Sequence, residues 1–325
     1  MTTRLAAARL GLGLGLGLLV ALPASAQPGG FDLQAHRGGR GETTEESLRG
    51  FAKAIEIGVT TIEFDVEITE DGQPVVWHDP TIDPEKCADT APAFPGDPDY
   101  PYVGKLVHDL TLAQLRTLDC GRRLEEFPRA EVVPGNKIAV LPEVFALADS
   151  YRADVRYNIE TKVAADKPAE SADPRQFVDV ILAAVRAAGK TDRVEIESFD
   201  WRTLPLVRRA EPSIPLVALW DETTWVEGSP WLAGVDPAVV GDPAAAAATI
   251  GADIASPDYA MVDRAFVDRA HWLGLRVIPW TVNAAATMRE QIGCGVDGLI
   301  TDYPTVLRGV LAEFGMPLPK AYHRS

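Results

Sequence analysis

The chain has 325 residues, and its 31 Lys and Arg against 47 Asp and Glu give a formal net charge of −16. A surface this acidic repels nucleic acid and anionic membranes, so an anionic substrate needs local cations or a metal ion to approach it. The length suits a single α/β barrel, which typically has about 250 residues.

The first 26 residues have the pattern of a secretory signal peptide. Arg4 and Arg9 precede or enter an apolar run that ends in Ala24-Ser25-Ala26, a small-residue cleavage site. An uncleaved membrane anchor is the alternative, but the run is short for a span of about 20 residues. The residue directly after the cleavage site is not a cysteine, which argues against a lipoprotein. We therefore expect a secreted, extracellular chain of 325 − 26 = 299 residues, whose charge is −18 after loss of the two arginines.

Apolar, β-rich runs alternate with helical patterns through residues 27–325, which favours a parallel sheet wrapped by helices. Two helix starts are recognisable: Thr111 with Gln114 forms a capping-box pattern, and Asp242 is an N-cap before a proline. The eight expected strands are 33–36, 61–65, 156–160, 194–198, 215–219, 253–256, 276–280 and 297–301.

A ninth β-rich run, "VVWHD" (75–79), returns directly after the second strand. A parallel neighbour requires a crossover of about a dozen residues or more, and far fewer separate these two runs. They therefore form an antiparallel hairpin, with Asp71-Gly72 as a favoured two-residue turn. The remaining eight strands fit a (β/α)8 TIM barrel from which this hairpin projects.

Residues 80–140 break the alternation, since they are rich in Pro and Asp and too long for an ordinary loop. Because they follow the hairpin, we expect a small insert or lid over the site; the alternative is a surface excursion with no role in binding. Cys87 and Cys120 are expected to pair in a secreted chain, with two free thiols as the alternative. We expect Cys294 to be a small packing residue.

The hairpin brings polar residues together at the end of the second strand. A turn at Asp71-Gly72 places Asp65 opposite His78, and residues directly opposite have Cβ atoms about 5 Å apart. Glu63, Asp65 and His78 then share one face at the C-terminal end of a barrel strand, where such barrels place their active sites. A bulge would shift this register by one residue.

Other strand ends converge on the same mouth: the first ends in His36-Arg37, and the third in Glu160 followed by Lys162. Three carboxylates with no thiolates favour a hard divalent cation such as Ca²⁺ or Mg²⁺. Two histidines suit a general acid and a general base, and Arg and Lys suit the oxygens of a phosphate. Taken singly, each motif is more often structural; the joint arrangement at successive strand ends favours a site.

The remaining polar candidates are expected outside the chemistry. Glu67 lies beyond the barrel rim, so we expect it to be solvated. His108, His271 and His323 lie off the strand ends, and we expect structural roles for them.

The sequence resembles the glycerophosphodiester phosphodiesterase family. The likeness runs through "AHRGGRGETTEESLRGF", "GVTTIEFDVEITEDGQPVVWHD", "NIETK", "PWTVN" and "GVDGLITDYP". The resemblance implies a (β/α)8 barrel with an insert after the second motif. It also implies hydrolysis of glycerophosphodiesters to glycerol 3-phosphate and an alcohol with the aid of a divalent metal.

Carried over residue by residue, the resemblance makes His36 and His78 the catalytic acid–base pair. The metal ligands it implies are Glu63, Asp65 and Glu160, and the substrate-binding residues are Arg37, Lys162 and Trp280. Packing at the barrel top is the alternative for this tryptophan.

One segment departs from the family pattern. The family commonly has Pro-Glu-Asn-Thr where this chain has Thr44-Glu45-Glu46-Ser47. Glu45 keeps the acidic position and Glu46 adds a charge, which still suits a helix start.

Two rival functions remain. A phospholipase D-like enzyme acting on lysolipids or sphingomyelin needs an apolar membrane-docking loop; the charge of −18 argues against one, although residues 225–234 supply two tryptophans. A non-catalytic binding descendant of the fold does not need an acid–base pair. We expect a monomer that acts on a small-molecule phosphodiester, without nucleic acid or stable membrane insertion.

Overall fold

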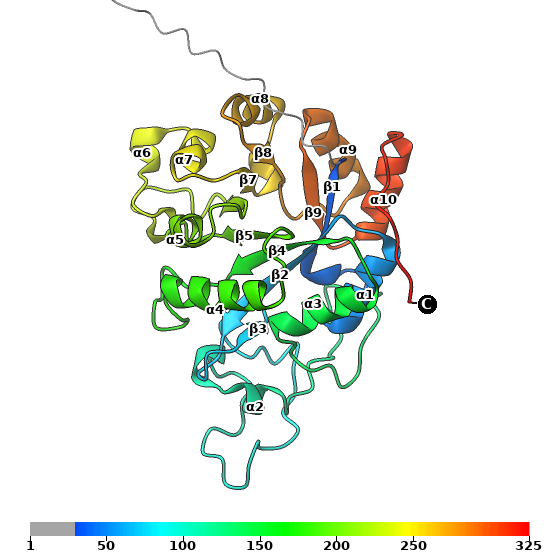
Figure 1. The fold of residues 1–325 in the computed structure, drawn as a ribbon, viewed down its shortest axis with the longest axis vertical. Helices are drawn as coiled ribbons and strands as arrows, with labels where there is room; N and C mark the ends of the chain where they lie inside the picture. The colour runs from blue at the N-terminus through cyan, green and yellow to red at the C-terminus, as the bar shows by residue number, and fades with distance from the viewer. Residues whose placement is uncertain (1–29, 325) are drawn as a thin grey trace, which may run out of the picture.

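The computed structural model describes residues 30–324, so the expected signal peptide lies outside the described residues. Eight strands follow one another around a barrel in the order β8-β7-β6-β5-β4-β2-β1-β9, and neighbouring strands are parallel (Figure 1). The ring closes between β8 and β9, where Asp297 N donates to Val277 O at 2.8 Å and Ile300 N to Pro279 O at 3.0 Å. The strands are β1 Asp32–Ala35, β2 Thr61–Ile68, β4 Arg156–Thr161, β5 Val194–Ser198, β6 Leu216–Trp220, β7 Ile254–Pro257, β8 Arg276–Val277 and β9 Gly298–Thr301.

Helices cover the outside of this barrel, which confirms the predicted (β/α)8 architecture (Figure 1). Both predicted helix starts are present: Thr111 and Gln114 form the capping box, and Asp242 accepts from Ala245 N. None of the described helices is both long and apolar enough to cross a bilayer. The helices are α1 Leu48–Ile57, α2 Leu112–Leu115, α3 Leu141–Ser150, α4 Pro174–Ala187, α5 Thr203–Ala210, α6 Pro237–Val240, α7 Pro243–Thr249, α8 Arg264–Trp272, α9 Ala285–Cys294 and α10 Pro304–Glu313.

The hairpin forms, but its predicted register is wrong by one residue. Strand β3 (Pro74–Val76) pairs antiparallel with β2 so that Val66 lies opposite Val76 and Glu67 opposite Val75. The turn holds three residues rather than two. Thr69 N donates to Gln73 O, the Thr69 hydroxyl accepts from Gln73 N, and Gly72 takes a positive φ of 73°. Such three-residue loops commonly end in a left-handed residue.

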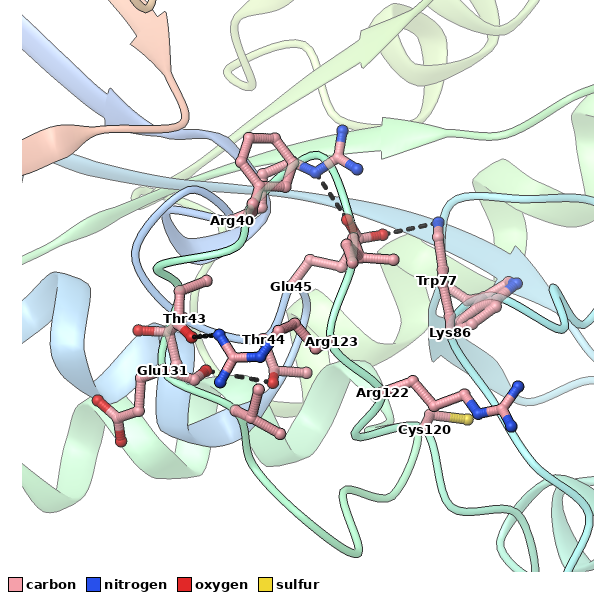
Figure 2. Close-up of a pocket in the computed structure, with 14 residues that line it drawn as sticks. Arg40, Thr43, Thr44, Glu45, Trp77, Lys86, Cys120, Arg122, Arg123 and Glu131 are labelled. Atoms are coloured by element: carbon pink, nitrogen blue, oxygen red, sulfur yellow. Dashed lines mark hydrogen bonds and ion pairs between the residues drawn. The ribbon is translucent and has the colours of Figure 1, made fainter.

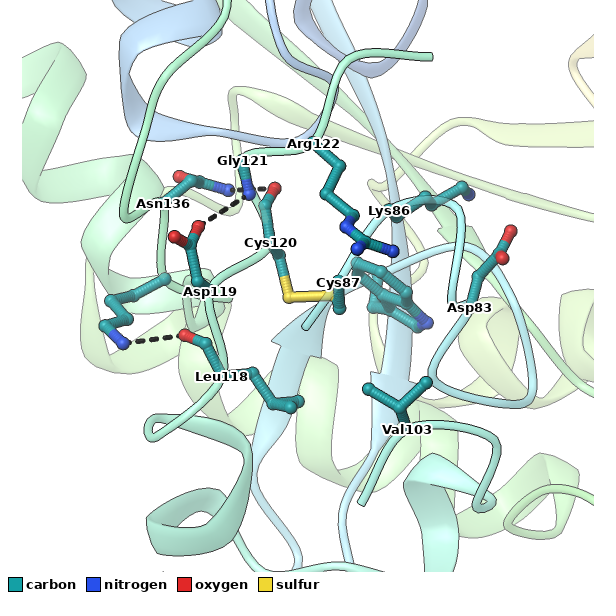
Figure 3. Close-up of a disulfide and its surroundings, with 12 residues drawn as sticks. Asp83, Lys86, Cys87, Val103, Leu118, Asp119, Cys120, Gly121, Arg122 and Asn136 are labelled. Carbon is teal, nitrogen blue, oxygen red and sulfur yellow. Dashed lines mark hydrogen bonds between the residues drawn. A yellow bond between two sulfur atoms is a disulfide. The ribbon is translucent and has the colours of Figure 1, made fainter. Parts of the chain in front are cut away.

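Residues 80–140, which include α2, form a small lobe beside the hairpin at the bottom of Figure 1. The lobe has its own apolar cluster, which packs against Val75 and Trp77 of the hairpin. A disulfide joins Cys87 to Cys120 across 33 residues, and the neighbouring Ala88 and Asp119 form an antiparallel bridge (Figure 3). The disulfide therefore cross-links the lobe, and the apolar cluster packs it against the hairpin.

The barrel interior is divided. On β6 to β9 it is apolar, and on β2, β4 and β5 it is acidic. Asp65, Glu160 and Glu197 are partners in register across β2, β4 and β5, so they lie in one row. The apolar half consists of Val217, Ile254, Ile278 and Ile300. The acidic half consists of Glu63, Asp65, Glu67, Glu160, Glu195 and Glu197, all buried.

Candidate active site

A cavity of about 220 Å³ opens at the C-terminal end of the barrel strands. It gathers the expected site residues from five strand ends, although they are far apart in the sequence. Asp65 lies beside the cavity rather than in its wall, held by the two cations described below. The lining includes His36, Arg37, Glu63, His78, Glu160, Lys162, Glu197, Phe199 and Trp280.

His36 is fixed through its Nδ1 atom, which lies 2.5 Å from Asp302 Oδ1. Asp302 is held in turn by Asn283, whose Nδ2 donates to Asp302 Oδ2 at 2.7 Å and whose Oδ1 accepts from Asp302 N at 2.9 Å. With Nδ1–H donating to the carboxylate, Nε2 is left on the cavity side, 4.0 Å from Glu63 Oε2.

His78 is fixed in the same way by a different pair. Its Nδ1 lies 2.8 Å from Asp79 Oδ1, and Lys86 Nζ donates to Asp79 Oδ2 at 2.5 Å. Desolvation, followed by the charges of Lys162 and Arg37, lowers the pKa of His78 to about 3. At neutral pH the ring is therefore uncharged and can accept a proton at Nε2.

Two cations line the cavity and engage the acidic half. Arg37 Nε lies 3.1 Å from Asp65 Oδ2, and Lys162 Nζ lies 3.5 Å from Asp65 Oδ1 and 2.7 Å from Glu160 Oε1. Burial alone would raise the pKa of Asp65, but the charges of Lys162 and Arg37 hold it well below its usual range. Asp65 is therefore a carboxylate in the ligand-free protein.

Three carboxylates converge beside these cations. Glu63, Glu160 and Glu197 each offer an oxygen, and these oxygens lie within 4.8 Å of one another. Burial, and then repulsion from neighbouring acids, raises the pKa of Glu63 and of Glu197 well above the usual range; burial is also the main cause that raises that of Glu160 to about 7. Buried hard oxygen donors without thiolates fit a divalent cation, whose charge would offset this repulsion.

Glu197 is a residue that the sequence prediction missed. It lies in the predicted strand 194–198, and its parity matches that of Glu195, so "VEIES" repeats the alternating acids that drew attention to Glu63 and Asp65. Asn158 Nδ2 donates to Glu197 Oε2 at 2.6 Å and holds it in the barrel.

The expectation that Glu67 is solvated is wrong. The side chain is only 1% exposed, burial raises its pKa well above the usual range, and its Oε2 has no partner among the described residues. The reason is that the segment after β4 folds over the hairpin, so Glu67 lines a cavity together with Lys162, Val163 and Ala164.

Glu45 and Glu46 have distinct structural roles, and neither caps α1, which is capped by the Ser47 side chain. Glu45 lies between two cations, with Arg40 Nε and Lys86 Nζ each 2.7 Å from its carboxylate (Figure 2). Glu46 has a positive φ of 51°, and its Oε1 accepts from Asp65 N at 3.1 Å. Glu46 thus joins the loop between β1 and α1 to β2, and Glu45 joins the same loop to the insert.

Lys86 is the insert's contribution to the site, and the sequence did not point to it. It is 8% exposed and precedes the disulfide-bonded Cys87, and its carbonyl accepts from Arg122 N (Figure 3). The disulfide therefore holds in place the residue that orients Asp79.

The other histidines and the third cysteine lie away from this cavity. His271 Nε2 lies 2.8 Å from Asp297 at the N-terminal end of the barrel, and His108 lies in the insert, in the 3-10 turn Val107–Asp109. His323 belongs to the C-terminal tail, and Cys294 is the last residue of α9, half-buried and packed against the core.

Comparisons with known proteins point in one direction. The model of the glycerophosphoryl diester phosphodiesterase family matches residues 36–306. The glycerophosphodiester phosphodiesterase of Caldanaerobacter subterraneus is 27% identical over 86% of this chain and 98% of its own, and that of Bacillus subtilis is 28% identical over 85% of each chain.

Solved structures share the fold. A candidate glycerophosphoryl diester phosphodiesterase of Silicibacter pomeroyi superposes with a TM-score of 0.75 at 29% identity, covering 89% of this chain and 95% of its own. An Oleispira antarctica phosphodiesterase in complex with the product sn-glycerol-3-phosphate gives a TM-score of 0.65 at 18% identity, covering 86% and 96%.

Proposed function

Because the chain belongs to the glycerophosphoryl diester phosphodiesterase family, we propose that it hydrolyses glycerophosphodiesters to glycerol 3-phosphate and an alcohol with the aid of a divalent cation. The observation that carries this proposal is the pairing of two imidazoles across one cavity, each with its Nδ1 held by an aspartate, beside a carboxylate cluster and two cations. That arrangement suits acid–base cleavage of an anionic phosphodiester.

The residues that would hold the cation are Glu63 and Glu160 together with Glu197, whose oxygens converge. Asp65, the other ligand that we propose, lies in register with Glu160 but pairs with Arg37 and Lys162 in the ligand-free protein. When bound there, Ca²⁺ or Mg²⁺ supplies Lewis-acid polarisation of the phosphate and a lower pKa for a hydroxyl at the site. The convergence of the Glu63, Glu160 and Glu197 oxygens, and the raised pKa values of Glu63 and Glu197, support a cation at this cluster.

The side chains would divide the remaining work. Arg37 and Lys162 neutralise the phosphoryl oxygens and their charge in the transition state. One histidine takes a proton from the attacking hydroxyl, and the other gives a proton to the leaving alkoxide oxygen. Asp302 and Asp79 hold Nδ1 of each ring, which leaves Nε2 for these transfers. The ring that acts as base has a free Nε2, whereas the ring that acts as acid carries a second proton on Nε2, so it is an imidazolium that its aspartate stabilises.

We also propose that residues 1–26 are removed, that the mature chain is secreted, and that it works as a monomer. The basic start, the apolar run and Ala24-Ser25-Ala26 support the cleavage. Mass spectrometry of the protein recovered from culture medium tests it, since an intact N-terminus on cell-bound protein would overturn it.

The lysolipid alternative is less well supported. A human lysophospholipase D is 23% identical to this chain over 301 residues, so such activity occurs among its relatives. The two tryptophans offered for membrane docking are half-buried, however, and both contact other parts of the protein. Trp225 packs 6.1 Å from Trp201 between ring centroids, and Trp231 lines a cavity beside the site.

The test is hydrolysis of glycerophosphocholine by the purified mature protein, followed by ³¹P NMR. We expect glycerol 3-phosphate as the product, loss of activity with EDTA, and recovery with Ca²⁺ or Mg²⁺. Undiminished hydrolysis in EDTA would overturn the metal requirement, and no hydrolysis of any glycerophosphodiester with either cation would overturn the activity.

A further inference from the structure

A second cavity, of about 230 Å³, opens next to the first, and the two share His78, Glu160, Lys162 and Phe199. It lies between the hairpin, the segment that follows β4, and the 3-10 turn Pro230–Leu232 after β6. Since His78 stands in both walls, a group bound in the second cavity can be covalently joined to a phosphate bound in the first.

The charges of this second cavity leave two carboxylates without a cationic partner. Lys162 is engaged by Glu160 and Asp65, and Lys167 lies 3.6 Å from Glu170. No Lys, Arg or His nitrogen of the described residues lies within 4.0 Å of the carboxylates of Glu67 or Asp166.

Glu67 makes the cavity more than a cluster of surface acids. Its side chain is almost wholly buried, lines the cavity, and leaves Oε2 without a hydrogen bond among the described residues. A buried polar atom without a partner is unfavourable and usually marks a missing ligand, water or ion.

The wall that faces these acids is aromatic. Phe199 and Trp231 line the cavity with ring centroids 6.4 Å apart and planes at 75°. Phe199 also contacts Trp280 of the first cavity at 5.3 Å and 80°, so the aromatic wall continues from one cavity to the other. Aromatic faces beside carboxylates bind quaternary ammonium groups through cation–π attraction.

We propose that this second cavity is the subsite for the alcohol half of the substrate and that it selects an alcohol bearing a quaternary ammonium group, as choline does. The inference rests on the proposed phosphodiesterase function and adds the class of leaving alcohol. A neutral polyol leaves the charge of Asp166 unmatched, and an anionic alcohol is repelled by it. A bound cation also supplies the attraction that Glu67 Oε2 lacks among the described residues. A primary ammonium group matches the charge but gains less from the aromatic wall.

The test compares kcat/KM for glycerophosphocholine, glycerophosphoethanolamine and glycerophosphoglycerol with the same added cation. We expect the choline substrate to exceed the glycerol substrate by about tenfold, with the ethanolamine substrate between them. Trp231→Ala and Glu67→Gln should each lower this preference about fivefold or more, and Trp231→Phe should retain most of it. Trp272→Ala is the matched control, because that tryptophan is 74% exposed on α8.

Saturation-transfer NMR on the methyl signal of free choline supplies a readout that does not depend on turnover. We expect transfer to choline with the wild type and a clear loss with Trp231→Ala. Equal kcat/KM on all three substrates, or choline binding unaffected by Trp231→Ala, would overturn the subsite while leaving the phosphodiesterase function standing. Choline binding at Trp231 without hydrolysis of any substrate would support the subsite and overturn the function.

Discussion

The two halves of the barrel interior differ in what they bury. The apolar half, on β6 to β9, buries aliphatic side chains. This burial stabilises the folded state by about 25 cal/mol for every Å² of apolar surface removed from water. The acidic half, on β2, β4 and β5, buries six acidic side chains whose desolvation opposes folding. The barrel thus separates the side chains that pack from those that react. Substitutions in the apolar half should lower stability and leave turnover almost unchanged, whereas substitutions in the acidic half should lower turnover and need not lower stability.

The largest expected effect is on turnover at the mouth of the acidic half. His36→Ala and His78→Ala should each lower kcat by a factor of about 10² to 10⁴, because each removes one proton-transfer group. Circular dichroism and thermal unfolding should stay close to the wild type. Near-normal turnover of glycerophosphocholine in either variant would break the assignment of the acid–base pair.

The next effect is on stability and belongs to the apolar half. Ile254→Ala should lower the free energy of unfolding by about 2–5 kcal/mol, since it leaves a cavity in a fully buried site. Urea unfolding measures this loss, and kcat at a temperature where the variant is folded should change little. A large fall in kcat without loss of stability would contradict the division of the interior.

A change in the acidic half should act on stability with the opposite sign. The raised pKa of Glu197 means that the folded state holds a proton that the unfolded state releases above about pH 4.5. Without a cation, stability is therefore lost as pH rises through the folded pKa of Glu197. Glu197→Gln should remove this loss, so its stability relative to wild type should increase as the pH rises above about 4.5.

Thermal unfolding in EDTA across this pH range checks the sign. Glu197→Gln also relieves the repulsion on Glu63, which changes the difference between the two proteins in the same direction. Adding Ca²⁺ or Mg²⁺ should shrink the advantage of the variant. A variant that is less stable than wild type at every pH without cation would contradict the proposed repulsion.

The smallest effect concerns the insert. Lys86→Met should lower kcat by about tenfold with little change in KM, since Lys86 orients Asp79 and Asp79 orients His78. Lys86→Arg should recover part of the loss. Lys105→Met is a matched control, because that lysine pairs with Asp99 of the insert; an equal loss in both lysine variants would show a general disturbance of the insert instead.

The fold was predictable because alternation and loop length are local properties. The crossover argument identified the hairpin and left eight strands for the barrel. The register failed because the turn depends on Thr69, whose hydroxyl and backbone hydrogen bonds to Gln73 stabilise a three-residue loop over the favoured pair at Asp71-Gly72. Glu67 was predicted as solvated because the burying segment follows β4, far away in the sequence.

The site was predictable where its residues lie at strand ends, as His36 and Glu160 do, or share the strand face of such a residue, as Glu63 does. Its supporting partners were not. Asp302 lies 266 residues from His36, and Lys86 reaches Asp79 only because the insert folds back on the hairpin. Such contacts depend on tertiary packing, which no local spacing records.

The central claim is that the acidic half holds one divalent cation for the reaction, and calorimetric titration with Ca²⁺ or Mg²⁺ tests it most directly. We expect one bound cation per chain in the wild type, unchanged binding in Ile254→Val of the apolar half, and at least about tenfold weaker binding in Glu63→Gln and Glu160→Gln. A wild type that binds neither cation, or acid variants that bind as tightly as the wild type, would contradict the account.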